Sequence, residues 1–264
     1  MDNSMSNRGP DTDPEKSVES GQSSTGALME TLRTVVIAVL IALGVRTFAY
    51  EPFNIPSSSM EPTLLIGDYL FVSKLSYGYS KYSLPFSPDL FDGRVFFSEP
   101  EMGDVAVFRT PRDVKTDYIK RIVGLPGDEI EVREGVLYIN GEPAERERLL
   151  PSELEAVDYP SAQGAVYWET LPNGRRHLIH EQMDTAPWDN WGPEVVRPGH
   201  VFAMGDNRDN SQDSRSRSVG QIPFENLVGR ADVLFFSHDS SASWWEVWRW
   251  PGAIRFGRIG DAIQ

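Results

Sequence analysis

The chain has 264 residues and a formal net charge of −14, which comes from 39 acidic and 25 basic side chains. This acidic balance opposes nonspecific binding to nucleic acids and to anionic lipid surfaces, so we expect no nucleic-acid partner. The absence of cysteine excludes disulfides and a thiol nucleophile, and the four histidines lack the carboxylate spacing of a metal centre, so we expect no metal and no cofactor.

The N-terminal part of the chain combines a polar tail with an apolar run. Residues 1–26 are nearly free of large apolar side chains and predict a disordered tail. The apolar run covers residues 34–45 and is flanked by arginines. Because a bilayer core of ~30 Å needs about 20 residues, we extend this run and predict one transmembrane helix over residues 27–50. A buried soluble helix or the core of a cleaved signal peptide is the alternative.

Three consecutive serines, Ser57 to Ser59, follow the apolar run and lie between Pro56 and Pro62. Proline fixes its own φ and pushes the preceding residue toward extended geometry, so a long helix through the serines is disfavoured. The sequence therefore predicts a stiff turn that presents hydroxyl groups. A Ser/Pro-rich linker between a membrane segment and a soluble domain is the alternative.

Short segments rich in β-branched and aromatic residues follow, bounded by turn residues. They predict strands over residues 69–74, 103–108, 118–124, 129–132, 136–139, 200–204 and 228–236. Asn140-Gly141 predicts a two-residue hairpin turn, because both positions of a type I′ turn need positive φ. The chain is thus predicted to be mostly β. We expect a large β-sheet domain from residues 51–141 and 198–264, with an inserted smaller β subdomain at residues 142–197, preceded by the transmembrane helix.

The C-terminal segment carries Trp244, Trp245, Trp248 and Trp250, followed by arginines. Indole prefers the membrane–water boundary and arginine interacts with lipid headgroups, so this segment is a candidate for docking on the membrane. Packing of the tryptophans against the β domain is the alternative.

Lys120 is the unusual residue of its predicted strand. Tyr118 and Ile122 share its face, which places an ammonium group beside apolar side chains. Burial lowers the pKa of a lysine, as a lysine general base requires, and a serine hydroxyl becomes a nucleophile when such a base takes its proton. A lysine that snorkels to solvent, or that pairs with Asp104 or Asp117, is the alternative.

A dense polar segment at residues 205–215 follows the strand at 200–204. Its carboxylates Asp206, Asp209 and Asp213, together with Asn207 and Asn210, could form a calcium loop. However, Arg208 interrupts them, and the spacing does not fit an EF-hand, so calcium is the weaker interpretation.

Four segments together resemble the motif blocks of bacterial type I signal peptidases, the leader peptidases. They cover residues 52–64, 103–108, 118–128 and 205–215, and they come in the family's order behind a membrane anchor. The resemblance implies a mostly β catalytic domain with an inserted β subdomain. It also implies a membrane-anchored serine endopeptidase that removes signal peptides from exported preproteins and cuts after small residues, at sites of the Ala-x-Ala type.

The resemblance assigns the catalytic roles. It implies that Ser59 is the nucleophile and that Lys120 is its general base, which later returns the proton to the leaving amine. The Ser57 hydroxyl and the Ser59 backbone N–H would form the oxyanion hole, whose donors are typically worth a few kcal/mol each.

The resemblance also assigns supporting and substrate-binding roles. Ser211 would hydrogen-bond the Lys120 amine, while Asp213 with Arg215 and Arg121 would brace the site. The side chains expected to line shallow pockets for small substrate residues are Phe53, Ile55, Pro56, Tyr118 and Ile119.

The same resemblance implies a place in the cell and a set of partners. We expect a single-pass protein of the bacterial inner membrane, with the tail in the cytoplasm and the catalytic domain on the periplasmic or outer side. Its partners would be exported preproteins and the lipid bilayer, and the secretion translocon is a candidate. Family members often carry two membrane segments, whereas this chain offers one good candidate.

Other functions remain open on the sequence. A specialised pilin-maturation peptidase of the same superfamily would share the chemistry. A self-cleaving SOS-repressor relative is disfavoured by the anchor and by the lack of a basic DNA-binding segment. A non-catalytic membrane-tethered β protein that binds exported chains would keep the fold while tolerating the loss of Ser59 or Lys120.

Overall fold

The computed structural model describes most of the chain after the polar tail. The described residues are 24–84, 87, 92–156, 159, 163–183, 185–243 and 245–264. Residues 1–23 of the expected disordered tail, and Trp244, therefore lie outside the described residues. The chain divides into two compact units, residues 1–42 and 43–264.

Helix α1 runs from Ser24 to Phe48 and has 25 residues. The stretch from Gly26 to Phe48 has a mean hydropathy of 2.0, and among the described residues it is the one helix long and apolar enough to cross a membrane. The predicted span continued to residue 50. The helix instead ends at Phe48 and Tyr50 starts strand β1, because Pro52 disfavours helical geometry in the residue before it.

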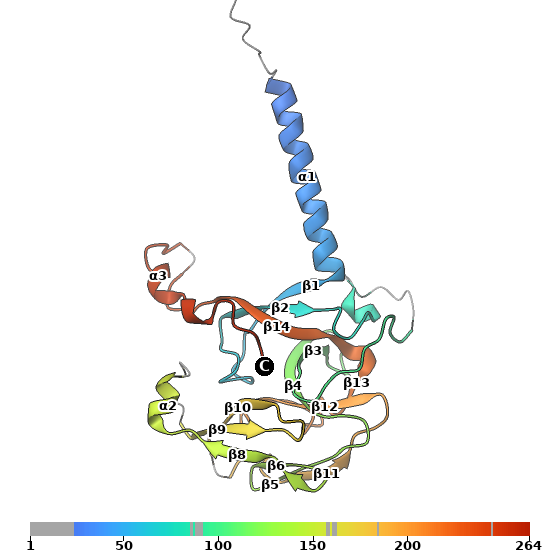
Figure 1. Ribbon diagram of the computed structural model, residues 1–264, viewed down its shortest axis with the longest axis vertical. Helices are drawn as coiled ribbons and strands as arrows, with labels where there is room; N and C mark the ends of the chain where they lie inside the picture. The colour runs from blue at the N-terminus through green and yellow to red at the C-terminus, as the bar shows by residue number, and fades with distance from the viewer. Residues whose placement is uncertain are drawn as a thin grey trace, which may run out of the picture. The chain divides into compact units, whose positions relative to one another are not determined.

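A seven-stranded antiparallel sheet forms the main part of the second unit (Figure 1). Its strands lie in the order β1-β2-β14-β3-β4-β12-β13. Their bounds are Tyr50–Asn54 for β1, Asp68–Ser73 for β2, Leu227–Ser237 for β14, Val105–Arg109 for β3, Asp117–Gly124 for β4, His200–Met204 for β12 and Ile222–Pro223 for β13. Strands far apart in sequence are therefore neighbours in this sheet, which confirms the mostly β prediction.

Two smaller sheets come from the segment between β4 and β12 and lie together in Figure 1. One has the order β11-β5-β6-β7, with bounds Trp191–Val195, Glu129–Arg133, Val136–Ile139 and Glu142–Pro143. The other has the order β10-β9-β8, with bounds Arg176–Glu181, Ala165–Thr170 and Glu145–Arg148, and is accompanied by helix α2 at Pro151–Ala156. The inserted subdomain was expected from residue 142, but the chain leaves the large sheet after Gly124, because β5 and β6 pair with β7 and β11.

The turn at Asn140-Gly141 joins β6 to β7 as the sequence predicts. Both residues have positive φ, 54° and 82°, and the flanking residues Ile139 and Glu142 pair with each other. This two-residue turn fixes the register of the hairpin at the edge of the smaller sheet.

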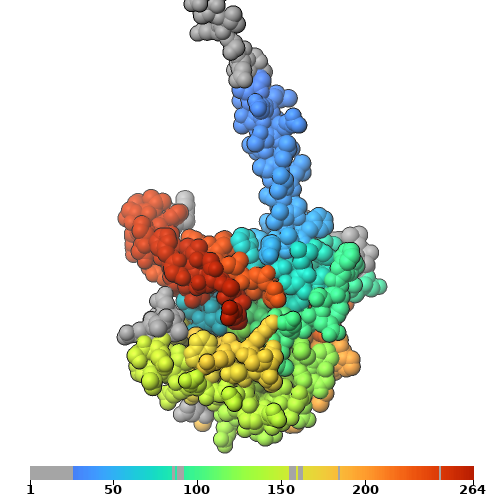
Figure 2. Space-filling model, viewed as in Figure 1, coloured from blue at the N-terminus to red at the C-terminus, as the bar shows by residue number. Residues whose placement is uncertain are grey.

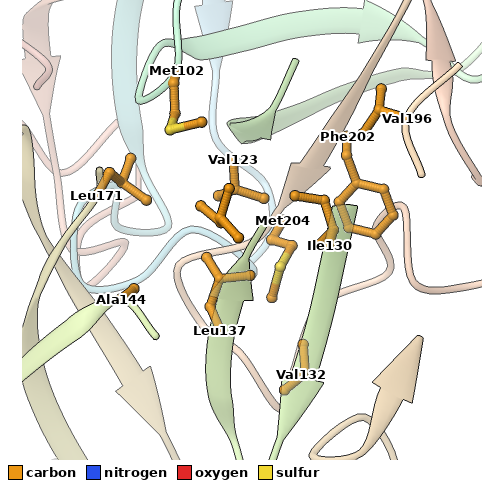
Figure 3. Close-up of a cluster of buried hydrophobic side chains, with 11 residues drawn as sticks. Met102, Val123, Ile130, Val132, Leu137, Ala144, Leu171, Val196, Phe202 and Met204 are labelled. Atoms are coloured by element: carbon orange, nitrogen blue, oxygen red, sulfur yellow. The ribbon is translucent and has the colours of Figure 1, made fainter. Parts of the chain in front are cut away.

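The smaller sheets are held by a buried cluster whose side chains point toward one another in Figure 3. Strands β4 and β12 of the large sheet contribute Val123, Phe202 and Met204, while β5 contributes Ile130 and Val132. Burial of such side chains contributes roughly 1.5–3 kcal/mol each. The same strand that carries Lys120 is thus fixed at its other end by this core.

Strand β3 is buried on both faces at the middle of the large sheet. Val105 and Val107 belong to one core cluster, whereas Ala106 and Phe108 belong to another on the opposite face. Adjacent β4 therefore has a rigid neighbour along residues 117–121, with Ala106 paired to Lys120. This arrangement fixes the backbone of the lysine.

The C-terminal segment lies at the surface of the second unit, where it is red in Figure 2. It includes helix α3 at Trp250–Ala253. The side chains of Trp245, Trp248 and Trp250 are exposed, with fractions of 60%, 72% and 42%. These three tryptophans are therefore not buried in the core of the β domain.

Candidate active site

The serine turn lies between β1 and β2 and is held by its flanks. The side chains of Met60 and Leu64 are fully buried, and the Leu64 N–H donates to the Met60 carbonyl at 2.9 Å. On the other side, the Ile55 N–H donates to the Asp68 carbonyl at 2.8 Å. The predicted stiff turn is therefore present, and Ser59 is fixed between two buried anchors.

Lys120 contacts Ser59 directly. The Lys120 Nζ donates to the Ser59 Oγ at 2.6 Å and to the Ile119 carbonyl at 2.7 Å. The lysine is only 3% exposed, and its Nζ lies 5.5 Å from the centre of the Tyr118 ring. The lysine therefore points into the protein toward the serine.

Burial sets the protonation of Lys120. It lowers the pKa of the amine to about 8, although the negative charges of Asp213 and Asp206 oppose the shift. At neutral pH roughly a tenth of such a lysine is the free amine, compared with far less than a hundredth at an ordinary lysine pKa. The amine is thus available as a base in the physiological range.

The alternative environments expected for this lysine are not found. Asp104 accepts hydrogen bonds from Tyr77 and Arg175, and Asp117 pairs with Arg109. Both carboxylates are therefore used by other partners, and the interpretation of Lys120 as an exposed or ion-paired strand residue is wrong.

The polar segment after β12 binds the serine turn through two asparagines that the sequence suggested only as members of the calcium-loop alternative. The Asn207 N–H donates to the Ser59 carbonyl at 3.2 Å, and its side chain donates to the Ser58 carbonyl at 3.1 Å. The Asn210 side chain donates to the Ser58 hydroxyl at 2.8 Å. Their only sequence signal is membership of the same polar segment.

Gly205 allows this close approach. A Cβ at this position would lie 2.4 Å from the Ser59 carbonyl oxygen and 2.2 Å from the Ser211 Oγ, well inside van der Waals contact. Any side chain here would therefore push the serine turn away from the polar segment.

The expected brace around Asp213 is present in part. The Arg215 guanidinium donates twice to the Asp213 carboxylate, at 2.9 and 2.8 Å, and the Gly205 N–H donates to it at 3.0 Å. Burial alone would raise the pKa of Asp213, but Arg215 holds it below its ordinary value. Arg121 does not join this pair; it donates to Asp206 at 2.9 and 2.7 Å.

The expected hydrogen bond between Ser211 and the Lys120 amine is not formed. Among the described residues, the buried Ser211 Oγ makes no hydrogen bond to Lys120, whose amine donates to its own strand at Ile119. Ser211 lines the same cleft as Lys120, so the prediction was right about the neighbourhood and wrong about the contact.

The three carboxylates of the calcium alternative face different partners. Asp206 binds Arg121 and Asp213 binds Arg215, whereas the Asp209 carboxylate accepts the Gln182 N–H at 2.7 Å. No shared ligand set results, so the calcium-loop interpretation is wrong.

A buried cluster of charged side chains behind the site was missed in the sequence. Arg208 donates to the Glu169 carboxylate of β9 through its two terminal guanidinium nitrogens, Nη1 and Nη2. The His177 Nε2 lies 3.3 Å from the same carboxylate. Burial would raise the pKa of Glu169, but Arg208 keeps it below the ordinary value, while burial and Arg121 lower the pKa of His177. The one sequence signal for this charged cluster was Glu169, a glutamate within an otherwise strand-like segment.

A cleft of about 750 Å³ opens over the serine and lysine. It is lined by all five residues expected to bind substrate, namely Phe53, Ile55, Pro56, Tyr118 and Ile119, together with Ser57, Ser59, Lys120 and Ser211. The Ser57 Oγ lies 3.4 Å from the Ser59 Oγ. Trp188, from the loop before β11, also lines the cleft and was not expected. The structure thus brings together segments that are far apart in sequence.

Comparison with known families matches the model of signal peptidase, peptidase S26, to residues 28–236. The chain belongs to the type I signal peptidase family. The signal peptidase I of Rickettsia typhi is 42% identical over 219 residues, which cover 79% of each chain. That of Rickettsia bellii is 37% identical over 263 residues, which cover 91% of this chain and 87% of the relative.

A solved structure is also similar to this chain. The crystal structure of a signal peptidase I from Enterococcus faecalis V583 matches with 27% identity and a TM-score of 0.31, covering 50% of this chain and 97% of that chain. From the family match and the relatives, the protein is a serine endopeptidase, as the sequence predicts.

Proposed function

We propose that this signal peptidase cuts exported preproteins with Ser59 as the nucleophile and Lys120 as the general base. The observation that carries the proposal is the 2.6 Å contact between the Lys120 Nζ and the Ser59 Oγ, made by a lysine that is buried and has a lowered pKa. A neutral amine in this position can accept the hydroxyl proton as the oxygen attacks.

The reaction then proceeds in two steps. Ser59 Oγ adds to the carbonyl carbon of the scissile bond while its proton moves to the Lys120 Nζ. Lys120 returns that proton to the leaving amine as the C–N bond breaks, which leaves an acyl-enzyme ester. Lys120 then takes a proton from water, whose oxygen attacks the ester, and returns it to Ser59 as the C–O bond breaks.

The oxyanion hole and the specificity pockets belong to the same proposal. The Ser57 hydroxyl, which is close to the Ser59 Oγ, and the Ser59 backbone N–H would stabilise the negative charge on the substrate oxygen. The apolar cleft walls at Phe53, Ile55 and Ile119 support a preference for small side chains, of the Ala-x-Ala type.

The membrane placement is also proposed. Helix α1 would anchor the protein once in the bacterial inner membrane, with the N-terminus in the cytoplasm and the β unit on the periplasmic or outer side, where the ends of signal peptides emerge. The lipid bilayer is then a partner, the exposed tryptophans of the C-terminal segment are candidates for contact with it, and the secretion translocon is a candidate neighbour.

The test is cleavage of a preprotein with an Ala-x-Ala site by the full-length protein in detergent. Ser59→Ala is expected to reduce cleavage to background, while Ser58→Ala, from the same serine run, is expected to lose less than about tenfold because it only removes a hydrogen bond with Asn210. Cleavage that survives Ser59→Ala would contradict the proposal, and an inert wild-type protein would favour a non-catalytic binder. Cleavage of pilin precursors alone would indicate the specialised peptidase.

A further inference from the structure

A chain of three polar side chains lies beside the serine turn, outside the Ser59–Lys120 pair. The Tyr159 hydroxyl oxygen lies 3.1 Å from the Glu61 Oε2 and 3.0 Å from the His180 Nδ1. The other ring nitrogen of the histidine, Nε2, lies 2.9 Å from the Gln163 carbonyl oxygen. His180 and Tyr159 are only 2% and 8% exposed, so their mutual contact is shielded from water, whereas Glu61 is half-buried.

The geometry fixes how many protons this chain holds. The Gln163 carbonyl can only accept, so the His180 Nε2 carries a hydrogen. The two remaining contacts, on either side of the Tyr159 oxygen, need one hydrogen each, and the tyrosine supplies only one. The second hydrogen sits on the Glu61 carboxyl or on the His180 Nδ1. With both contacts made, Glu61 and His180 therefore share one proton.

This chain holds the serine turn from both sides. The His180 N–H donates to the Asp206 carbonyl at 2.8 Å, and the Arg208 N–H donates to the His180 carbonyl at 2.9 Å. These bonds bracket Asn207, whose N–H donates to the Ser59 carbonyl. The histidine side chain reaches Glu61 through Tyr159, and Glu61 follows Ser59 by two residues.

We propose that Glu61, Tyr159 and His180 share a single proton and act as positioning residues for Ser59. This inference rests on the proposed function, because it takes Ser59 as the nucleophile. If this proton is removed, one hydrogen remains for the two contacts of the Tyr159 oxygen. One of these contacts then breaks, and the serine turn loses its support on that side. The Ser59 Oγ and backbone N–H then lose the alignment that catalysis needs, and kcat falls more than KM changes.

The charged neighbours are consistent with a shared proton. Besides Tyr159 and His180, the charges acting on Glu61 are those of Arg255 and Asp68. Asp68 is itself paired with Arg258 at 2.7 Å. Burial raises the pKa of Glu61, in the direction that favours the protonated carboxyl, while the hydrogen bond from Tyr159 opposes this shift.

The charged groups beside the histidine are already paired. Asp206 and Arg208 flank His180 through their backbones, while their side chains pair with Arg121 and Glu169. Glu61 is therefore the carboxylate that reaches the His180 ring, through the tyrosine.

The proton sharing is tested by nitrogen NMR of the histidine rings in the full-length protein in detergent micelles at one fixed pH, with the His180 signal assigned from His180→Gln. Glu61→Gln can still donate to Tyr159, whose hydroxyl then donates to a neutral ring, so the His180 ring nitrogen signals should move toward those of a neutral imidazole. Tyr159→Phe breaks the link and should change the same signals. Unchanged His180 ring signals in both variants would overturn the proposal.

The positioning role is tested by preprotein cleavage with the same variants. Tyr159→Phe is expected to lower kcat about tenfold and to change KM less than about twofold, and Glu61→Gln to lose less kcat because its contacts can re-form. Tyr138→Phe removes a hydroxyl from the β5–β6 hairpin and is the matched control, with wild-type kinetics expected. Wild-type kcat in Tyr159→Phe would overturn the positioning role even if the proton is shared. The NMR result does not depend on peptidase activity, so failure of the proposed function would be recognised separately.

Discussion

Lys120 and Arg121 are consecutive residues of β4, and both are almost completely buried, yet their surroundings differ. Arg121 lies against the Asp206 carboxylate with two hydrogen bonds. Among the described residues, the amine of Lys120 donates hydrogen bonds to a hydroxyl and to a backbone carbonyl oxygen. Alternation along the strand sends the two side chains to opposite faces. One face of β4 thus holds a paired charge, and the other holds a cation without a contacting carboxylate.

The difference shows that the depth of burial alone does not decide what a basic group can do. A guanidinium stays ionised in proteins, and a contacting carboxylate offsets the loss of its hydration on burial. Without one, burial lowers the pKa of Lys120 to about 8. The paired face can therefore serve as a rigid support, while the unpaired face can exchange a proton.

The largest effect is expected from making Lys120 resemble its neighbour. In Lys120→Arg the side chain stays protonated at any usable pH, so it cannot act as a base. We expect preprotein cleavage to fall at least ~10³-fold. Single-turnover cleavage would measure this, with a thermal melt to show that the variant is folded. Substantial activity in this variant would mean that another group accepts the serine proton.

A large effect on stability is expected when the paired face loses its carboxylate. Asp206→Asn leaves the buried Arg121 without a negative partner and should lower the free energy of unfolding by about 3–5 kcal/mol. Denaturant unfolding followed by tryptophan fluorescence measures this change. Asp232→Asn is the control, because its pair with Arg230 is partly exposed and should contribute less than about 1 kcal/mol. Equal losses in the two variants would contradict a special role for the buried pair.

A smaller effect is expected on the protonation of Lys120. The Asp213 carboxylate raises the pKa of the lysine against the effect of burial, so Asp213→Asn should lower that pKa further. The midpoint of the pH dependence of cleavage should then move to lower pH, by about one unit or less. A shift to higher pH, or none in a variant that melts like the wild type, would show that Asp213 does not act on the lysine.

Features that depend on a few neighbouring residues could be predicted from the sequence. The serine turn and Lys120 were candidates because each breaks a local pattern: three hydroxyls lie between prolines, and an amine lies on an apolar strand face. The resemblance to the signal peptidases then singled out Ser59 among the three serines and gave both residues their roles. The strands and the Asn140-Gly141 turn were likewise predicted from local periodicity and turn chemistry.

Partners that depend on tertiary packing were not predictable in this way. The carboxylate that binds Arg121 is Asp206 and not Asp213, and both belong to one polar segment, so only the fold distinguishes them. Glu169 and His180 come from the segment expected as the inserted subdomain, and their roles depend on where the sheet β10-β9-β8 packs. The start of those sheets after Gly124 was missed because β5 and β6 read like any other strands.

The most direct test of the account is the pH dependence of kcat/KM for preprotein cleavage by the wild-type protein. The neutral form of Lys120 is the base, so the rate should rise with pH and level off above a midpoint of about 8. At pH ~6 only about 1% of the lysine is neutral, so the rate should be about 100-fold below the plateau. A rate that is flat between pH ~6 and ~9, or that keeps rising toward the pKa of an ordinary lysine, would contradict a buried, unpaired Lys120 as the general base.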